Sequence, residues 1–157
     1  AQSDAFVRDG QYASQSYGNN SYLVVKSDGS GYSRKTALKF DLTGLDLTSS
    51  STALLRLHIR NVNADASRDI TVSRLSGSNW QESNLTWNTL PAVDQVGASV
   101  SITPSQIGTW LEVDVSNLIQ AGTLSLLLEN NGPASGKSDV SFSSRESGSG
   151  PELIVTP

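Results

Sequence analysis

The sequence contains no cysteine and no methionine, and the first of these absences excludes several kinds of chemistry. Without cysteine the chain can form no disulfide framework, no thiolate nucleophile and no cysteine-ligated zinc site. Charged residues make up only 17% of the chain, against about 25% in an average soluble domain. No apolar run approaches the roughly 18 residues of a membrane span. Polarity comes mainly from serine and threonine, which suit the solvent faces of strands and turns better than exposed helices.

The length and the charge balance narrow the choice of partners. We expect residues 1–157 to form one module, a processed chain or a piece of something larger. Fifteen acidic and eleven basic residues leave a net charge of −4, which attracts neither nucleic acid nor an anionic membrane over long distances. We therefore expect a monomer that binds no nucleic acid and no membrane. Most of the basic residues lie in the first half of the chain, where a local cluster can still bind an acidic sugar.

Short alternating segments separated by turns predict an all-β fold, an antiparallel β-sandwich. Leu38, Phe40 and Leu42 are expected to face inward, and Val24 is expected on the opposite face of its strand from Leu23 and Val25. Helical periodicity is scarce, with one turn expected around residues 116–120. The expected strands are residues 21–26, 36–42, 53–60, 69–75, 110–115, 123–129, 139–144 and 152–156.

The inventory of reactive side chains argues against an enzyme. His58 is the only histidine, it lies mid-strand between the outward Arg56 and Arg60, and no G-x-S-x-G nucleophile motif occurs. Paired carboxylates for glycoside hydrolysis stay open, because spacing within a sandwich cannot be read from sequence. Tyrosine and arginine, which a polysaccharide lyase can use, are too common to be informative. We predict no enzymatic activity.

Oxygen ligands for calcium occur near the start of the chain, and Glu146 could approach them from the far end. No EF-hand spacing is present, and backbone hydrogen bonding in turns explains Asp and Asn at these positions. We predict no cofactor and leave a structural calcium open. The residues concerned are Asp4, Asp9, Asn19, Asn20 and Asp28.

Aromatic and basic side chains supply the candidate binding residues. Trp80 and Trp87 bracket a dense segment that we interpret as a packed corner of the sandwich. The lysines and arginines of residues 26–39 come from two segments expected to pair as a hairpin across the turn at 28–33, which would place their outward side chains on one face. The alternative is a solvated edge whose lysines discourage aggregation. The outward row Arg56, His58 and Arg60 has the same two interpretations.

Four segments resemble one known family, the DNRLRE-type domain of carbohydrate-binding module family 96, whose characterised members resemble appendages of alginate-degrading enzymes. The corner around Thr86-Trp87-Asn88 is the most distinctive of them. The four segments are residues 3–18, which resemble the family's first strand and the following turn; residues 32–42, its Arg-then-Phe-Asp strand; residues 80–91; and residues 142–155, its Ser-Arg-Glu and last strand.

The resemblance implies a β-sandwich of the jelly-roll type that binds a glycan without catalysis, secreted or at the cell surface and linked to a catalytic domain. For alginate-type members it implies a basic groove that grips carboxylates. The residues that would bind the carboxylates are Lys26, Arg34, Lys39 and Arg145, and Tyr32 would line the groove beside them. Side chains alternate along a strand, so Arg34 is expected to face inward like Leu38. Arg34 therefore reaches a groove only if the strand starts after it or carries a bulge.

Two other functions remain open from the sequence. A module for neutral glycans would bind by aromatic stacking, for which Tyr12, Tyr17 and Tyr32 lie in turns where exposure is expected. A structural or adhesion module of a surface protein would bind no glycan. The first hypothesis, a module for an acidic polysaccharide such as alginate, differs from both in predicting binding that weakens with salt.

Overall fold

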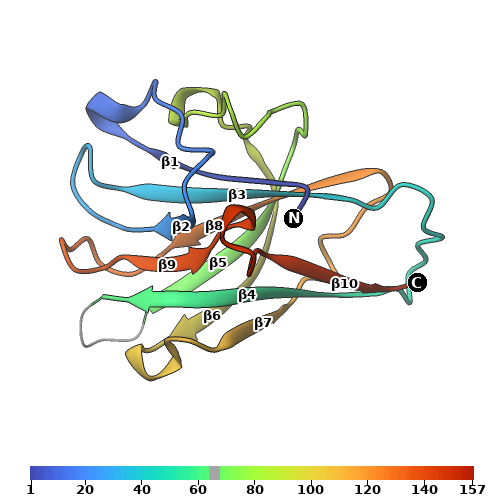
Figure 1. The fold of residues 1–157 in the computed structure, drawn as a ribbon. Helices are drawn as coiled ribbons and strands as arrows, with labels where there is room; N and C mark the ends of the chain where they lie inside the picture. The colour runs from blue at the N-terminus through green and yellow to red at the C-terminus, as the bar shows by residue number, and fades with distance from the viewer. Residues whose placement is uncertain (64–67) are drawn as a thin grey trace.

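Two antiparallel β-sheets lie face to face in the computed structural model, which describes residues 1–63 and 68–157 (Figure 1). The first sheet has the strand order β1-β3-β8-β5-β6, and the second has the order β10-β4-β9-β2 with β7 added on β4. The all-β sandwich of the jelly-roll type is thereby confirmed. The strands are β1 (Ser3–Arg8), β2 (Tyr22–Val25), β3 (Arg34–Asp41), β4 (Thr52–Val62), β5 (Arg68–Leu75), β6 (Val93–Ile102), β7 (Trp110–Asp114), β8 (Thr123–Asn130), β9 (Val140–Ser143) and β10 (Glu152–Thr156).

Among the described residues, four short 3-10 helices connect the strands. They are η1 (Gly10–Tyr12), η2 (Trp87–Thr89), η3 (Pro104–Gln106) and η4 (Arg145–Ser147). The expected turn at residues 116–120 is a hydrogen-bonded turn, with the Leu118 N–H donating to Val115 O over 2.9 Å, and not a helix. In the described part of the chain, no helix has the length and hydropathy needed to cross a membrane.

The main core fills the space between the sheets. Leu38 and Phe40 on β3 and Leu55 and Leu57 on β4 are buried there, as the alternation predicts, because successive side chains on a strand point to opposite faces. Val24 lies outside this core cluster, on the opposite face of β2 from Leu23 and Val25. It is only 3% exposed, so β2 is covered on both faces.

A second, smaller core lies on the outer face of the first sheet. The segment 76–91 folds over that face and buries Trp80 and Leu85 against Ala37 and Leu127. The Trp80 indole N–H donates to the Ser125 hydroxyl over 3.1 Å, so its polar edge is satisfied although the ring is buried. The interpretation of this segment as a packed corner is confirmed.

The expected hairpin between residues 21–26 and 36–42 is wrong. Strand β2 pairs with β9 in the second sheet, whereas β3 pairs with β1 and β8 in the first. The chain therefore crosses from one sheet to the other at the turn, and a single isolated bridge, Lys26 to Arg34, joins the two segments. Because of this crossing, the basic residues of 26–39 do not share one face.

Candidate functional site

One end of the sandwich, where β1 and β2 end and β3 begins, carries a cluster of basic and aromatic side chains. The Lys26 N–H donates to Arg34 O over 2.9 Å and the Arg34 N–H donates to Lys26 O over 3.0 Å. The loop between them is held by Asp9, whose Oδ1 accepts the N–H groups of Gly31 (2.9 Å) and Ser33 (3.0 Å). Since these bonds fix the loop to the end of β1, the side chains around it are held at fixed positions.

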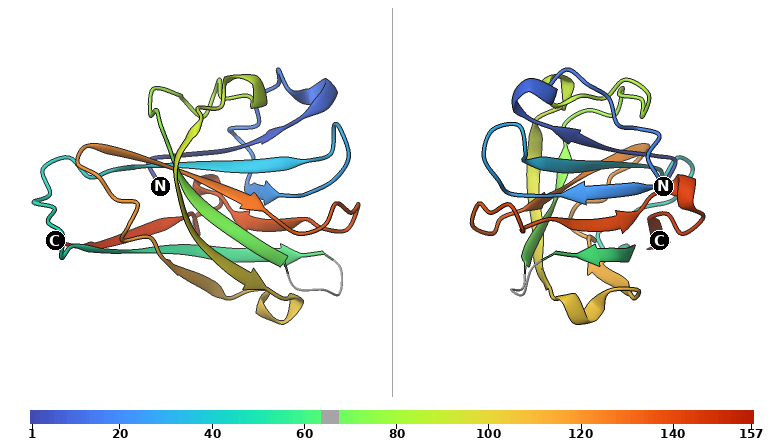
Figure 2. Two further views of the ribbon diagram at one scale, coloured as in Figure 1. Left: turned by 180° about the vertical axis from the view of Figure 1, so that it is seen from behind. Right: turned by 60° about the vertical axis from the view of Figure 1, so that its left-hand side comes forward.

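Helix η1 packs closely on the same loop. Gly10 has a φ of +61°, and a Cβ atom there would lie 2.5 Å from the Gly31 nitrogen. Only glycine combines this backbone conformation with such a close approach. In the two views of Figure 2, η1 and the segment around η2 lie side by side, where the Asn88 N–H donates to Ala13 O over 3.0 Å.

The Arg34 side chain lies on the inward face of β3, as alternation predicts, and it still reaches the surface. Strand β3 begins at Arg34 itself, so the side chain lies at the end of the sheet instead of within it. Its direct partner on the neighbouring strand is Arg8, the last residue of β1. Both side chains are partly buried, and they bring two guanidinium groups to the same end of the space between the sheets.

The cations at this end differ in how they are neutralised. The Lys26 ammonium is 3.1 Å from Asp28 and the Lys35 ammonium is 2.9 Å from Glu129. Within the described residues, neither Arg8 nor Arg34 forms an ion pair, and the Nε atom of each is buried without a hydrogen-bond partner.

Arg8 and Arg34 therefore remain available to an anion. Arg8 does donate from one guanidinium nitrogen to Gly31 O over 2.9 Å. Desolvation lowers the pKa of Arg34, and the nearby positive charge of Arg8 lowers it further. The negative charge of Asp139 acts against this lowering, and a bound anion would act in the same direction.

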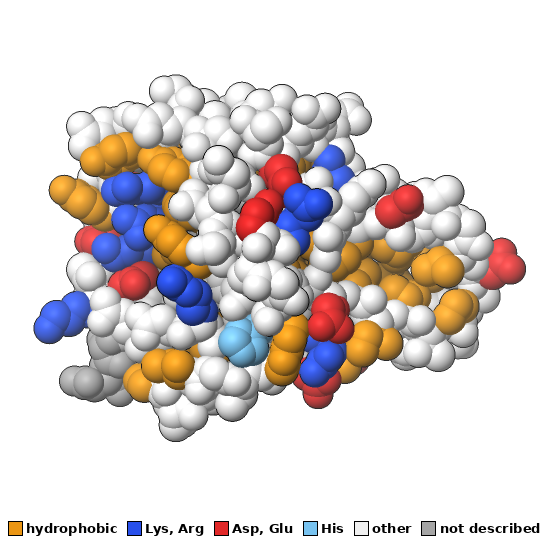
Figure 3. Space-filling view, viewed as in Figure 1, with side chains coloured by type: hydrophobic (Ala, Val, Ile, Leu, Met, Phe, Trp, Pro, Cys, Tyr) orange, Lys and Arg blue, Asp and Glu red, His pale blue; other side chains and the backbone are white. Residues whose placement is uncertain are grey.

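Aromatic rings flank the same cations. The Arg8 guanidinium carbon is 3.8 Å from the centre of the Tyr12 ring, and the Lys26 ammonium is 5.8 Å from that of Tyr32, which is 52% exposed. A depression of about 210 Å³ is lined by Lys26, Arg34 and Lys35 together with the acidic Asp9 and Glu129. We call Arg8, Lys26, Arg34, Lys35, Tyr12 and Tyr32 together the basic mouth. Figure 3 shows Lys and Arg side chains beside hydrophobic ones at this end, with acidic side chains nearby.

Two of the five residues assigned from the resemblance lie outside the basic mouth. Lys39 lies on the opposite face of β3 from Arg34, and at about 3.3 Å per residue it is about 16 Å further along the strand. Its ammonium group donates to Trp80 O and is 4.6 Å from the centre of the Trp80 ring. Arg145 is ion-paired with Glu82 at 2.5 Å and with Glu146 at 3.4 Å. The structure thus brings together Lys26, Tyr32 and Arg34 only.

Arg8, Tyr12 and Lys35 are the members of the basic mouth that were not among the five residues assigned from the resemblance. Lys35 adjoins Arg34 in the sequence, and this adjacency was the one available signal. Nothing in the sequence shows that Arg8 pairs with Arg34, because they belong to different strands and the register between strands is a tertiary property.

The outward row on β4 forms a separate surface. Arg56 lies between Glu112 (3.3 Å) and Glu152 (3.4 Å), so its charge is already balanced. The His58 Nδ1 is 2.9 Å from the Ser143 hydroxyl, and no carboxylate contacts this pair among the described residues. The pair therefore lacks the acid that orients the histidine in a hydrolytic triad.

Asp9 and Asp28, two of the calcium candidates, are engaged in turns. Asp9 Oδ1 accepts the two N–H groups described above, and Asp28 Oδ1 accepts the N–H of Gly29 over 2.7 Å. The amide of Asn20 donates to Tyr17 O over 3.1 Å. Asp4 and Glu146 lie together elsewhere, beside Glu82.

Comparison with known proteins identifies a family. The sequence model of carbohydrate-binding module family 96 matches residues 1–157, the whole chain. No curated protein matches this chain significantly. Among solved structures it is similar to the CBM22-1 xylan-binding domain from Paenibacillus barcinonensis Xyn10C, with 14% identity, 97% of this chain and 92% of that chain covered, and a TM-score of 0.35. Because the family match spans every strand of both sheets, the chain belongs to carbohydrate-binding module family 96.

Proposed function

We propose that this domain is a non-catalytic module that binds an acidic polysaccharide, a uronate polymer such as alginate, through the basic mouth. It would be secreted or displayed at the cell surface as a monomeric module. A lyase or hydrolase domain joined to it would be held close to its substrate, which raises the effective substrate concentration.

One observation carries this proposal: Arg8 and Arg34 are paired positions on β1 and β3, and neither has an acidic partner among the described residues. Placing two like charges on paired positions of neighbouring strands destabilises a sheet. A uronate carboxylate between them would neutralise both and could accept paired hydrogen bonds from their planar guanidinium groups. Lys26 and Lys35 would exchange their ion pairs for the ligand, and the pair of Lys35, whose side chain is 32% exposed, contributes little stability.

A neutral glycan is the second candidate, supported by the exposed ring of Tyr32. A sugar ring could stack on this face with its C–H groups toward the π system. Binding of that kind would depend on apolar contact, so added salt should change it little. Salt dependence therefore separates the two candidates.

The experiment is affinity electrophoresis and calorimetry of the isolated domain with alginate, polygalacturonate and neutral xylan at low salt and at half-molar salt. We expect retention by a uronate polymer that decreases strongly with salt, because the screening length falls well below 10 Å. Arg34→Ala should abolish most of the binding. Arg56→Ala, which removes an arginine already paired with two acids, is the matched control and should bind like the wild type.

Some results would contradict the proposal. Binding to xylan alone, or uronate binding of equal strength at both salt concentrations, would favour the neutral-glycan candidate. Unchanged binding in Arg34→Ala together with loss in Lys39→Ala or Arg145→Ala would move the site to those residues. Release of unsaturated oligosaccharides from a uronate polymer by the purified domain would show that it is catalytic.

A further inference from the structure

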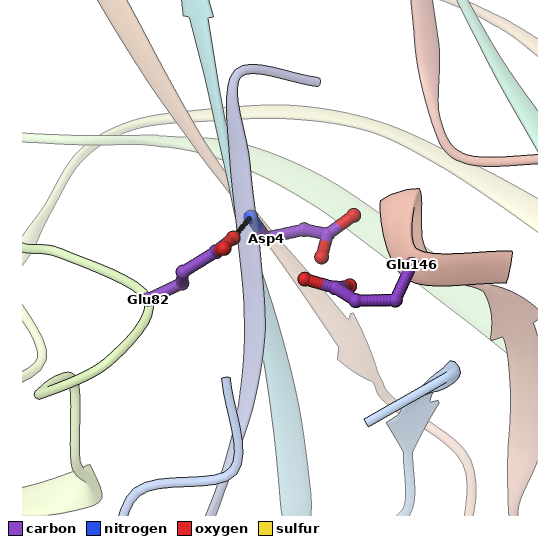
Figure 4. A group of neighbouring side chains, drawn as sticks. All are labelled: Asp4, Glu82 and Glu146. Atoms are coloured by element: carbon purple, nitrogen blue, oxygen red, sulfur yellow. Dashed lines mark hydrogen bonds between the residues drawn. The ribbon is translucent and has the colours of Figure 1, made fainter. Parts of the chain in front are cut away.

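Three carboxylates from distant parts of the chain converge around β1, the edge strand of the first sheet. Asp4 lies in β1, Glu82 in the segment that covers the first sheet, and Glu146 in η4. One carboxylate oxygen of each lies within 4.8 Å of the others. Figure 4 shows the Asp4 and Glu146 carboxylates pointing toward one another, with Glu82 reaching β1 from the other side.

The burial and the hydrogen bonding of the Asp4 carboxylate are the decisive features of this cluster. This residue is only 1% exposed. Its Oδ2 accepts the Arg145 backbone N–H over 2.8 Å, but its Oδ1 is buried and has no hydrogen-bond partner among the described residues. Burying a carboxylate oxygen without a partner is strongly unfavourable. A bound cation or a proton would satisfy this oxygen.

The backbone holds the cluster in place. The Asp4 N–H donates to Glu82 Oε2 over 3.1 Å. Gly18 packs so closely on residue 82 that a Cβ atom would lie 1.5 Å from the Glu82 carbonyl oxygen, so this part of the covering segment is fixed. On the other side, the Ser144 hydroxyl donates to Asn20 O over 2.6 Å and anchors the start of η4. The carboxylates are thus preorganised by contacts outside the cluster.

The charges within the cluster are not balanced. Arg145 is the cation that contacts it, through Nη1 at 2.5 Å from Glu82 and 3.4 Å from Glu146. Three carboxylates and one guanidinium leave 1 − 3 = −2. The guanidinium contacts the two glutamates, and the hydrogen bond of Arg145 to Asp4 comes from its backbone. The Arg145 guanidinium therefore forms no ion pair with Asp4.

We propose that Asp4, Glu82 and Glu146 bind one hard divalent cation, Ca²⁺. All the side-chain donors are oxygen atoms, the type that Ca²⁺ and Mg²⁺ prefer over softer metals. Ca²⁺ accepts six to eight ligands in flexible geometry, so three carboxylates with water at the exposed Glu146 side suit it better than they suit the rigid octahedron of Mg²⁺. The ion would join β1, the covering segment and η4, and thus stabilise the fold.

The test is thermal unfolding and calorimetry of the whole domain, stripped with EDTA and titrated with CaCl₂ or MgCl₂ to about 10 mM, a range that covers weak extracellular calcium sites. We expect one Ca²⁺ per chain, bound more tightly than Mg²⁺, and a melting temperature that rises by about 5 °C or more at a hundredfold excess over Kd. Asp4→Asn and Glu146→Gln should each weaken Ca²⁺ binding at least tenfold. Glu112→Gln, which removes an exposed acid paired with Arg56, is the matched control and should keep the full response.

Arg145→Ala distinguishes the proposal from a purely internal salt-bridge network. If Ca²⁺ shares the carboxylates with Arg145, removing the guanidinium should raise Ca²⁺ affinity, whereas a structural network without metal would only lose stability. The proposal is overturned if the wild type shows neither heat nor a shift with Ca²⁺, or if Glu146→Gln, an exposed substitution that should fold, responds like Glu112→Gln. None of these measurements involves a glycan, so they are independent of the proposed function.

Discussion

Arg8 at the end of β1 and Arg34 at the start of β3 are direct cross-strand partners on the face that looks into the sandwich. Their position at the end of both strands keeps them accessible, although the same face further along is filled by Leu38 and Phe40. A domain with a net charge of −4 thus keeps two neighbouring arginines that form no ion pair with the acids of the described residues. Their proximity is the physical basis of the proposed uronate binding.

If both guanidinium groups hold the same carboxylate, their contributions to binding should be coupled. Arg8→Ala and Arg34→Ala are each expected to weaken uronate binding by about tenfold or more, the range for hydrogen bonds to charged groups. The double variant should lose clearly less than the product of the two single effects. Calorimetry with a uronate oligosaccharide measures all four affinities, and strictly multiplicative losses would mean that the two arginines contact different parts of the ligand.

Removing the counter-charge of Lys26 should strengthen binding. Asp28 pairs with Lys26 at 3.1 Å, and the Gly29 N–H followed by Lys26 holds the pKa of Asp28 below its usual range. Asp28→Asn frees the lysine for the ligand, so we expect severalfold tighter uronate binding at low salt. Asp41→Asn is the matched control because its carboxylate also accepts a local N–H, from Thr43, but lies at the other end of β3. Equal or weaker binding by Asp28→Asn would show that Lys26 does not contact the polymer.

The same pKa shift predicts how this site responds to acid. The carboxyl group of Asp28 has a lowered pKa in the fold, so any stability from its contacts is complete above the unfolded pKa and is lost only as the pH falls through the folded pKa. Uronate affinity is therefore expected to stay constant from pH 8 to about pH 5, when followed by calorimetry at fixed ionic strength. A change in affinity within this pH range would show that a group other than Asp28 controls binding.

Substitutions of Tyr32 distinguish charge-based binding of a uronate polymer from aromatic stacking on a neutral one. If its ring only lines a charged groove, Tyr32→Phe should bind uronate polymers like the wild type and Tyr32→Ala should lose a few fold. If stacking dominates, Tyr32→Ala should abolish binding to the neutral polymer and the loss should be independent of salt. Affinity electrophoresis on alginate and xylan gels measures both. Tyr17→Ala would be a poor control because its ring stacks on Phe6 at 4.8 Å.

The covering segment is predicted to contribute to stability through its buried side chains. Leu85 is fully buried against the first sheet, so Leu85→Ala should lower the free energy of unfolding by about 2–5 kcal/mol. Leu45→Ala, at a position that is 40% exposed, should change it by less than about 1 kcal/mol. Denaturant unfolding gives both values. A loss below about 1 kcal/mol in Leu85→Ala would mean that the segment unfolds separately from the sheets.

Much of the fold follows from local sequence pattern. The alternation around Leu38 and Leu55 identified β3, β4 and their inward faces, because the pleat of a strand gives side chains a period of two. The paired tryptophans 80 and 87 marked the covering segment correctly. Strand β6 escaped detection because it is an edge strand with two register shifts against β5, and its side chains are largely exposed.

The candidate site could be predicted only in part. Lys26, Tyr32 and Arg34 surround one turn, so local sequence places them together whatever the topology. Lys39 was grouped with them on the assumption of a hairpin, which fails because β2 and β3 belong to different sheets. Arg145 proved to be the partner of two glutamates distant in topology from that turn. Their roles in binding remain predictions.

By itself, then, the sequence determined that the chain forms strands, which faces of most strands are apolar, and which side chains can carry positive charge. Only the tertiary structure decided that Arg8 is paired with Arg34 and that Asp4, Glu82 and Glu146 meet. The reason is physical: periodicity and turn preferences act between neighbours in the chain, whereas sheet membership and strand register depend on pairings between distant segments, which the packing of the whole core selects.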